Sequence, residues 1–144
     1  MKNTDYQCSF VAKANTAQAL KAISHVSEWW AKRFEGSARR LGDVFTVRFG
    51  DTFVTFRVSE LVAYKKVVWL VSACHLPWLD NKTEWNGTTC VWELSTQGEI
   101  TQVKFTHVGL VPGIECYEVC RKGWNEYVAG SLYNLITAGK GQPN

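Results

Sequence analysis

The histidines and cysteines are the side chains of this sequence most able to take part in chemistry. Histidine exchanges protons near neutral pH, and His75 and His107 fall near the ends of two predicted strands, on faces expected to point inward. They could therefore bind the polar group of a ligand or act as an acid–base pair. The competing interpretation is that each ring satisfies backbone groups at its strand end. His25 lies between two predicted helices and is expected at the surface.

The five cysteines do not form a recognisable metal site. Cys116 and Cys120 lie one helical turn apart, and with His107 they are a conceivable set of ligands. However, no fourth ligand follows at a known spacing, and the sequence has no Cys-x-x-Cys or His-x-x-x-His pair. We therefore expect reduced, buried thiols and no metal or other cofactor. The sequence also has no phosphate-binding glycine loop and no nucleophile-elbow serine, so it contains no catalytic motif that we recognise.

Aromatic residues are the unusual feature of the composition, with seven Trp, seven Phe and five Tyr among 144 residues. So many large rings indicate either a bulky core or a cavity lined by rings. We favour a cavity, because a curved sheet around one helix encloses more volume than the helix fills. The residues expected to line it are Trp30, Phe56, Trp69, His75, Trp92, Phe105, His107, Trp124, Tyr127 and Val128.

The N-terminal part of the chain predicts one strand and two short helices. Apolar and polar residues alternate over residues 6–12, as in a half-buried strand. Asn15 is placed to cap a first short helix, with Gln18 as its reciprocal partner. A second short helix around residues 27–32 would carry the pair Trp29-Trp30.

A first hairpin is predicted around the dipeptide Gly50-Asp51. If these two residues form the turn, Val47 lies opposite Val54 and Phe45 lies opposite Phe56. The apolar side chains then share one face of the sheet.

A second hairpin is predicted around Gln97-Gly98. This turn would place Trp92 opposite Val103 and Cys90 opposite Phe105. Both hairpins therefore agree with an antiparallel sheet that has one apolar face.

The strand over residues 66–76 is apolar on both faces, so its orientation depends on the turn that precedes it. Closing that turn between Ala63 and Lys66 pairs His75 with Val54 and turns the odd-numbered residues, including Trp69, inward. The loop that follows, residues 77–87, contains Trp78 and Trp85, which either dock onto the domain or form part of a cavity mouth.

After Pro112-Gly113 the apolar spacing becomes helical and predicts a long amphipathic helix. It should end near Ala138, because Gly139 suits the left-handed position after a helix. Its apolar stripe consists of Tyr117, Cys120, Trp124, Tyr127, Val128, Ser131, Leu132, Leu135 and Ile136.

Length and charge limit the class of protein. The chain fits a single domain over residues 1–144, with an ordered core of about 4–139 and a short tail at 140–144. Its net charge of +3 is dispersed, which argues against a nucleic-acid partner. It shows no signal peptide or membrane span, so a cytoplasmic location is expected. The oligomeric state does not follow from the sequence.

The order of these elements resembles the START-like or helix-grip fold of the SRPBCC superfamily, which includes proteins of the birch-pollen-allergen type. Within it, the chain is most similar to the group related to the C-terminal domain of the heat-shock-protein-ninety ATPase activator. The segments that carry this resemblance are 19–30, 91–94, 105–110, 123–127 and 131–141. It implies an α+β fold in which a curved antiparallel sheet of about six strands surrounds the long C-terminal helix.

A shared fold does not fix a function, so three hypotheses remain open. The first is binding of a small hydrophobic, amphipathic or aromatic molecule between the sheet and the C-terminal helix. The second is a protein-interaction domain, similar to a co-chaperone, whose partner is a chaperone or another protein. The third is an enzyme of the cyclase or dehydratase type that uses His75 or His107 as a general base.

Overall fold

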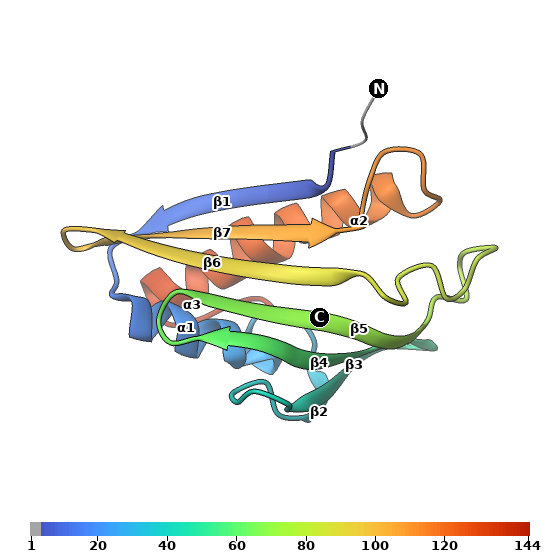
Figure 1. Cartoon of the computed structure of the whole chain (residues 1–144), viewed down its shortest axis with the longest axis horizontal. Coiled ribbons are helices and arrows are strands. Elements are labelled where there is room, and N and C mark those ends of the chain that lie inside the picture. The colour runs from blue at the N-terminus through green and yellow to red at the C-terminus, as the bar shows by residue number, and fades with distance from the viewer. Residues whose placement is uncertain (1–3) are drawn as a thin grey trace.

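A curved seven-stranded antiparallel sheet holds the long C-terminal helix against its concave face in the computed structural model, which describes residues 4–144 (Figure 1). The strand order is β1-β7-β6-β5-β4-β3-β2. The strands are β1 (Tyr6–Ala12), β2 (Arg33–Gly36), β3 (Val44–Phe49), β4 (Thr52–Val62), β5 (Lys66–His75), β6 (Thr89–Gln97) and β7 (Ile100–Val108). This is the helix-grip fold expected from the sequence, with short β2 as an additional strand at one edge.

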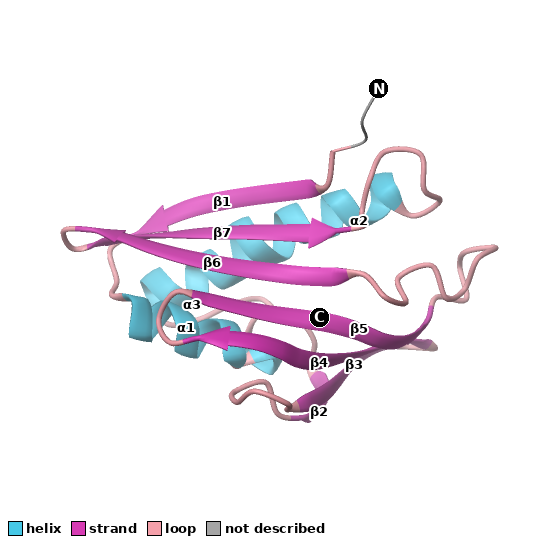
Figure 2. Cartoon of the chain, viewed as in Figure 1, coloured by secondary structure: helices cyan, strands magenta, loops and turns pink. Residues whose placement is uncertain are grey.

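The helices all lie on one side of the sheet (Figure 2). They are α1 (Thr16–Ser24), the single 3₁₀ turn η1 (Val26–Glu28) and a continuous C-terminal helix made of α2 (Tyr117–Trp124), the wider π-helical segment η2 (Asn125–Leu132) and α3 (Tyr133–Ala138). Gly139 ends this helix with a φ of 79°, as predicted. No helix within the described residues 4–144 has the length and hydropathy to cross a membrane.

The start of α1 has the predicted capping box. Gln18 N donates to Asn15 Oδ1 at 2.8 Å, and Asn15 N donates to Gln18 Oε1 at 2.9 Å. The second helix is shorter than predicted and ends before the indole pair. Trp29 and Trp30 instead stack on each other with ring centroids 6.0 Å apart. Burial of both rings in the core outweighs continuation of the short helix, because each ring removes a large apolar area from water.

The two predicted hairpins differ in how closely the structure follows them. In β3–β4, Val47 lies opposite Val54 and Phe45 opposite Phe56, as predicted. In β6–β7 the turn lies one residue later than predicted, at residues 98–99, so Trp92 pairs with Phe105. This register differs from the prediction by two residues. A shift of two leaves every side chain on its predicted face.

The predicted pairing of β5 with β4 was wrong from the turn onward, because Val62 rather than Ala63 lies opposite Lys66. Two irregularities also interrupt this ladder, one between Thr55 and Phe56 and one between Val58 and Glu60. Beyond them, Cys74 lies opposite Val54 and His75 lies opposite Phe53. Since a shift of one residue exchanges the two faces, Cys74 points inward at this end of the strand and His75 lies on the outer face. Trp69, on the other side of the first irregularity, points inward as predicted and is fully buried.

Residues 140–144, predicted to lie beyond the ordered core, are attached to it by backbone hydrogen bonds. Asn144 N donates to Trp30 O at 2.9 Å, and Lys32 N donates to Asn144 O at 3.0 Å. Gln142 N also donates to Ser131 Oγ at 2.6 Å. The segment therefore lies beside the Trp29-Trp30 pair and becomes part of the surface around it.

Gly141 provides a test of this attachment. A Cβ atom there would lie 2.4 Å from Glu28 O, a backbone atom that cannot move away without disturbing η1. We expect Gly141→Ala to lower the free energy of unfolding by about 1–3 kcal/mol through overpacking. Chemical denaturation measures this change, and an unaltered midpoint would show that the segment is not packed as described.

Candidate functional site

The interior between sheet and helix is filled by aromatic rings. The centroids of Trp69 and Trp92 lie 5.3 Å apart, and those of Trp92 and Phe105 lie 4.5 Å apart. Phe56 and Val128 belong to the same cluster, and all five side chains have no exposed area. These five residues, which were predicted to contact a ligand, therefore pack against one another in the core. They do not enclose a cavity between them.

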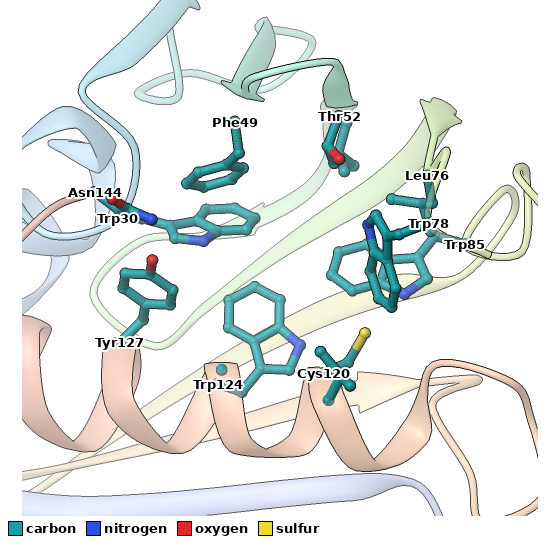
Figure 3. Close-up of a pocket in the computed structure, with 13 residues that line it drawn as sticks. Trp30, Phe49, Thr52, Leu76, Trp78, Trp85, Cys120, Trp124, Tyr127 and Asn144 are labelled. Atoms are coloured by element: carbon teal, nitrogen blue, oxygen red, sulfur yellow. The ribbon is translucent and has the colours of Figure 1, made fainter.

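An open, mostly apolar pocket of about 270 Å³ lies at one end of this cluster. It is bounded by α2, the β3–β4 turn, the end of β5, the loop after it and Asn144 (Figure 3). Three of the predicted residues, Trp30, Trp124 and Tyr127, border it. The other lining residues are Phe49, Thr52, Val54, Leu76, Trp78, Trp85, Val119, Cys120, Gly123 and Asn144.

His107 lies behind the pocket wall, where it is fully buried between two of the pocket indoles. Trp124 Nε1 donates to His107 Nδ1 at 3.1 Å, so this nitrogen carries no proton and Nε2 carries the proton of the neutral ring. Nε2 then donates to Thr88 Oγ1 at 2.9 Å, and Thr88 Oγ1 donates to Trp85 O at 2.7 Å. This chain of hydrogen bonds connects the C-terminal helix, β7 and the loop before β6. Burial lowers the pKa of His107 to about 3.

Trp85 forms the other half of the same wall. Its ring stacks on Trp124 at a centroid distance of 5.9 Å and an interplanar angle of 16°. Its Nε1 donates to Cys116 Sγ at 3.1 Å. The edge-to-face contact with His107, at 4.7 Å, fixes the second side of the indole. Both wall indoles thus have their N–H groups bonded inside the protein.

Two carboxylates fasten the loop of Trp78 and Trp85 to the start of the C-terminal helix. Glu84 accepts hydrogen bonds from the backbone N–H groups of Glu115 and Cys116, at 3.0 and 2.9 Å. In return, Glu115 accepts from the N–H groups of Asp80 and Asn81, at 2.7 and 3.0 Å. The bonds from Asn81 and Asp80 hold the pKa of Glu115 below its usual range. The loop is therefore held to the start of the C-terminal helix by four hydrogen bonds.

The pocket thiol has the character of an apolar group. Hydrogen bonding to Cys116 and burial both raise the pKa of Cys120 far above neutral pH. Because the thiolate is the nucleophilic and metal-binding form, Cys120 is unreactive in this environment. No cluster of three or more potential metal ligands occurs among the residues that the structure describes.

The two histidines proposed as an acid–base pair are not brought together. His107 lies inside the core, whereas His75 lies on the outer face of the sheet, where its ring stacks on Phe53 at 6.1 Å. Ten of the thirteen lining residues are not among the predicted ligand contacts, although Trp78 and Trp85 had been considered for a cavity mouth. Phe49 could have been found, because it continues the inward alternation of Phe45 and Val47. Asn144 had no such signal, since its position depends on backbone bonds to Trp30.

Solved structures with the same fold include the solution structure of the Aha1 dimer from Colwellia psychrerythraea, with a TM-score of 0.76 and 23% identity over 98% of this chain and 100% of that chain. A protein from Nitrosospira multiformis has a TM-score of 0.71 and 11% identity, over 94% of this chain and 98% of that chain. DynU16, from the dynemicin biosynthetic locus, has a TM-score of 0.67 and 16% identity; the match covers 94% of this chain and 48% of DynU16. At these identities the likeness establishes the fold alone.

No curated protein matches the sequence. The family model described as Activator of Hsp90 ATPase homolog 1-like protein matches residues 18–137.

The depressed pKa of His107 predicts a loss of stability in mild acid. Below pH 6.5 a histidine in the unfolded chain takes up a proton, whereas folded His107, with a pKa of about 3, does not. Proton uptake therefore favours the unfolded state. The contribution of neutral His107 to the free energy of unfolding is lost progressively as the pH falls below 6.5. One such histidine costs roughly 1 kcal/mol within the first pH unit below its unfolded pKa.

Urea denaturation at pH 7.5 and pH 5.5 measures this loss. Between these two pH values, the outer-face variant His75→Gln should lose as much free energy of unfolding as the wild type does. The variant His107→Asn should lose less. An equal loss in His107→Asn would contradict the assignment to His107.

Proposed function

The chain belongs to the Activator of Hsp90 ATPase homolog 1-like protein family, and from this premise we propose that it is a binding module for a small apolar or amphipathic molecule. The ligand occupies the pocket beside Trp30, Trp124 and Tyr127. The cytoplasmic location and single-domain organisation expected from the sequence stay predictions.

The observation that supports this proposal best is the composition of the pocket wall. Six of its thirteen lining side chains are aromatic, and none of them carries a charge. Apolar pockets with a few polar groups are the usual sites for small ligands. A ligand that covers the exposed ring surfaces gains about 25 cal/mol for each Å² of apolar area removed from water.

The wall is also preorganised. The Trp124–His107–Thr88 hydrogen bonds fix the two stacked indoles from behind, and the Glu84 and Glu115 carboxylates fix the loop from outside. A site that is already formed has less conformational entropy to lose on binding. This supports binding of a ligand without a large rearrangement of the pocket.

The cyclase or dehydratase hypothesis has less support than binding. His107 uses both ring nitrogens within the protein, and a pKa of about 3 makes it a poor base at neutral pH. His75 lies on the outer face, away from the pocket lining. The candidate general bases are therefore separated from the place where a substrate would bind.

A second candidate function, a protein-interaction module, is favoured by Trp78. Its side chain is 48% exposed at the pocket mouth, and exposed large rings are enriched at protein interfaces. The family description names an activator of the Hsp90 ATPase, which makes an Hsp90 protein the first partner to test.

Gly123 allows the pocket to be filled with little other change. It borders the pocket, and a Cβ atom there would meet no atom within 4 Å. We expect Gly123→Leu to reduce ligand affinity at least about tenfold by occupying the pocket. Its helix should not be weakened, because leucine has a higher helix propensity than glycine.

Titration of intrinsic tryptophan fluorescence with a panel of aromatic and lipid-like compounds measures the affinity. Gly130→Leu is the matched control, since Gly130 is in the same helix, has the same free space around its Cβ position and does not border the pocket. Equal binding by both variants would place the ligand elsewhere.

The interaction hypothesis predicts a different residue dependence. Trp78→Ser should weaken binding to an Hsp90 protein by about tenfold or more, as expected for a central interface ring, while Gly123→Leu should leave it unchanged. Surface plasmon resonance with purified Hsp90 measures both. Loss of Hsp90 binding in Gly123→Leu but not in Trp78→Ser would contradict a role for the pocket mouth.

A further inference from the structure

The pocket has a polar end and an apolar end. Figure 3 shows Trp30, Tyr127 and Asn144 together at one end, with the Tyr127 hydroxyl turned toward Trp30. The opposite end is formed by Leu76, Trp78, Trp85 and Cys120. Trp124 lies between the two ends, and the nitrogen edge of Trp30 is on the side of Trp124 and Tyr127.

Two polar side-chain groups at this end, Trp30 Nε1 and the Tyr127 hydroxyl, have no hydrogen-bond partner within residues 4–144. The three buried indoles that border the pocket differ in whether their Nε1–H group has a hydrogen-bond partner. Trp124 Nε1 donates to His107, and Trp85 Nε1 donates to Cys116. Trp30 is only 5% exposed, yet its Nε1 makes no hydrogen bond to the described part of the chain, and neither does the Tyr127 hydroxyl. The fully buried unpartnered donors of the described residues are Trp69 Nε1 and Trp92 Nε1 in the core, whereas Trp30 Nε1 is open to the pocket and free to donate to a bound ligand.

The charge around the pocket restricts the ligand further. None of the lining side chains is charged. The carboxylates of Glu84 and Glu115, which join the neighbouring loop to the start of the C-terminal helix, accept hydrogen bonds from backbone N–H groups. An anionic ligand would lose its hydration without gaining a cationic partner from the lining. The pocket therefore disfavours an anionic ligand.

The pocket wall favours an aromatic ligand. Rings from both ends of the pocket face the same space, with Phe49, Trp30 and Tyr127 at one end and Trp78 and Trp85 at the other (Figure 3). Aromatic pairs gain stabilisation in stacked or edge-to-face contacts beyond the area they bury. The volume of about 270 Å³ is slightly below the usual range for drug-sized ligands, which suits one or two fused rings.

We propose that the ligand is a flat aromatic molecule of one or two fused rings that has no negative charge and carries a hydroxyl or carbonyl oxygen at one end. The rings lie among the indoles, and the oxygen accepts a hydrogen bond from Trp30 Nε1 and bonds to the Tyr127 hydroxyl. This inference rests on the proposed function, because it specifies the ligand class of the same pocket.

Isothermal titration with three probes of similar shape tests the inference: naphthalene, 1-naphthol and 1-naphthoate. Wild type should bind 1-naphthol about 3- to 10-fold more tightly than naphthalene, as one or two neutral hydrogen bonds would give. It should bind 1-naphthoate more weakly than 1-naphthol. Tyr127→Phe and Trp30→Phe, which keep a ring but remove the polar group, should each reduce the preference for 1-naphthol over naphthalene.

Tyr133→Phe is the matched control, because Tyr133 is on the same helix but packs against Phe10, away from the pocket. It should keep the preference of the wild type. Since the preference is a ratio measured within one variant, partial unfolding does not imitate its loss.

The outcomes separate this inference from the proposed function. Equal binding of naphthalene and 1-naphthol, with no effect of Tyr127→Phe, would overturn the polar-end assignment and leave the apolar pocket intact. Strongest binding of 1-naphthoate would overturn the exclusion of an anionic ligand. Absence of binding by all three probes to the wild type would count against both the inference and the proposed function.

Discussion

The neutral His107 ring is the constraint on which the candidate site depends. It accepts a hydrogen bond from Trp124 on the C-terminal helix and donates one to Thr88, whose hydroxyl donates to Trp85 O. Three separate segments are therefore tied at one buried point. In the low dielectric of the core such bonds are strong when complete and costly when broken. The stacked indoles of the pocket wall are positioned by a side chain that does not itself border the pocket.

The aromatic cluster explains why the open space lies at one end of the molecule. Trp69 and Trp92 occupy the centre, and each has a buried Nε1 without a conventional partner within the described residues. Both rings make edge-to-face contacts, Trp69 with Phe45 at 78° and Trp92 with Trp29 at 83°. In such arrangements an N–H group can point at a ring face, a weak hydrogen bond that partly replaces the missing one. Rings of this size fill the centre of the helix grip and leave space only beyond them.

The tryptophans of this chain thus have different roles that their residue type does not reveal. Trp69 and Trp92 pack the core, Trp85 and Trp124 form a fixed wall, and Trp30 presents a polar edge to the pocket. The division follows from where each N–H group finds its partner. The same logic applies to the thiols, because burial and a neighbouring thiol turn Cys120 into an apolar surface rather than a nucleophile. Family membership does not fix the site, because one fold can carry many different sites.

The sequence by itself determined the elements: the cap at Asn15, the faces of both hairpins and the end of the long helix at Gly139 follow from local chemistry and spacing. The sequence also predicted that aromatic side chains line the site. Only the tertiary structure decided which rings are core and which are pocket, and on which face His75 lies. The irregularities in β4–β5 are not encoded by alternation, and one shifted residue exchanges the faces. The attachment of Asn144 beside Trp30 likewise depends on backbone bonds between distant segments, which no local pattern specifies.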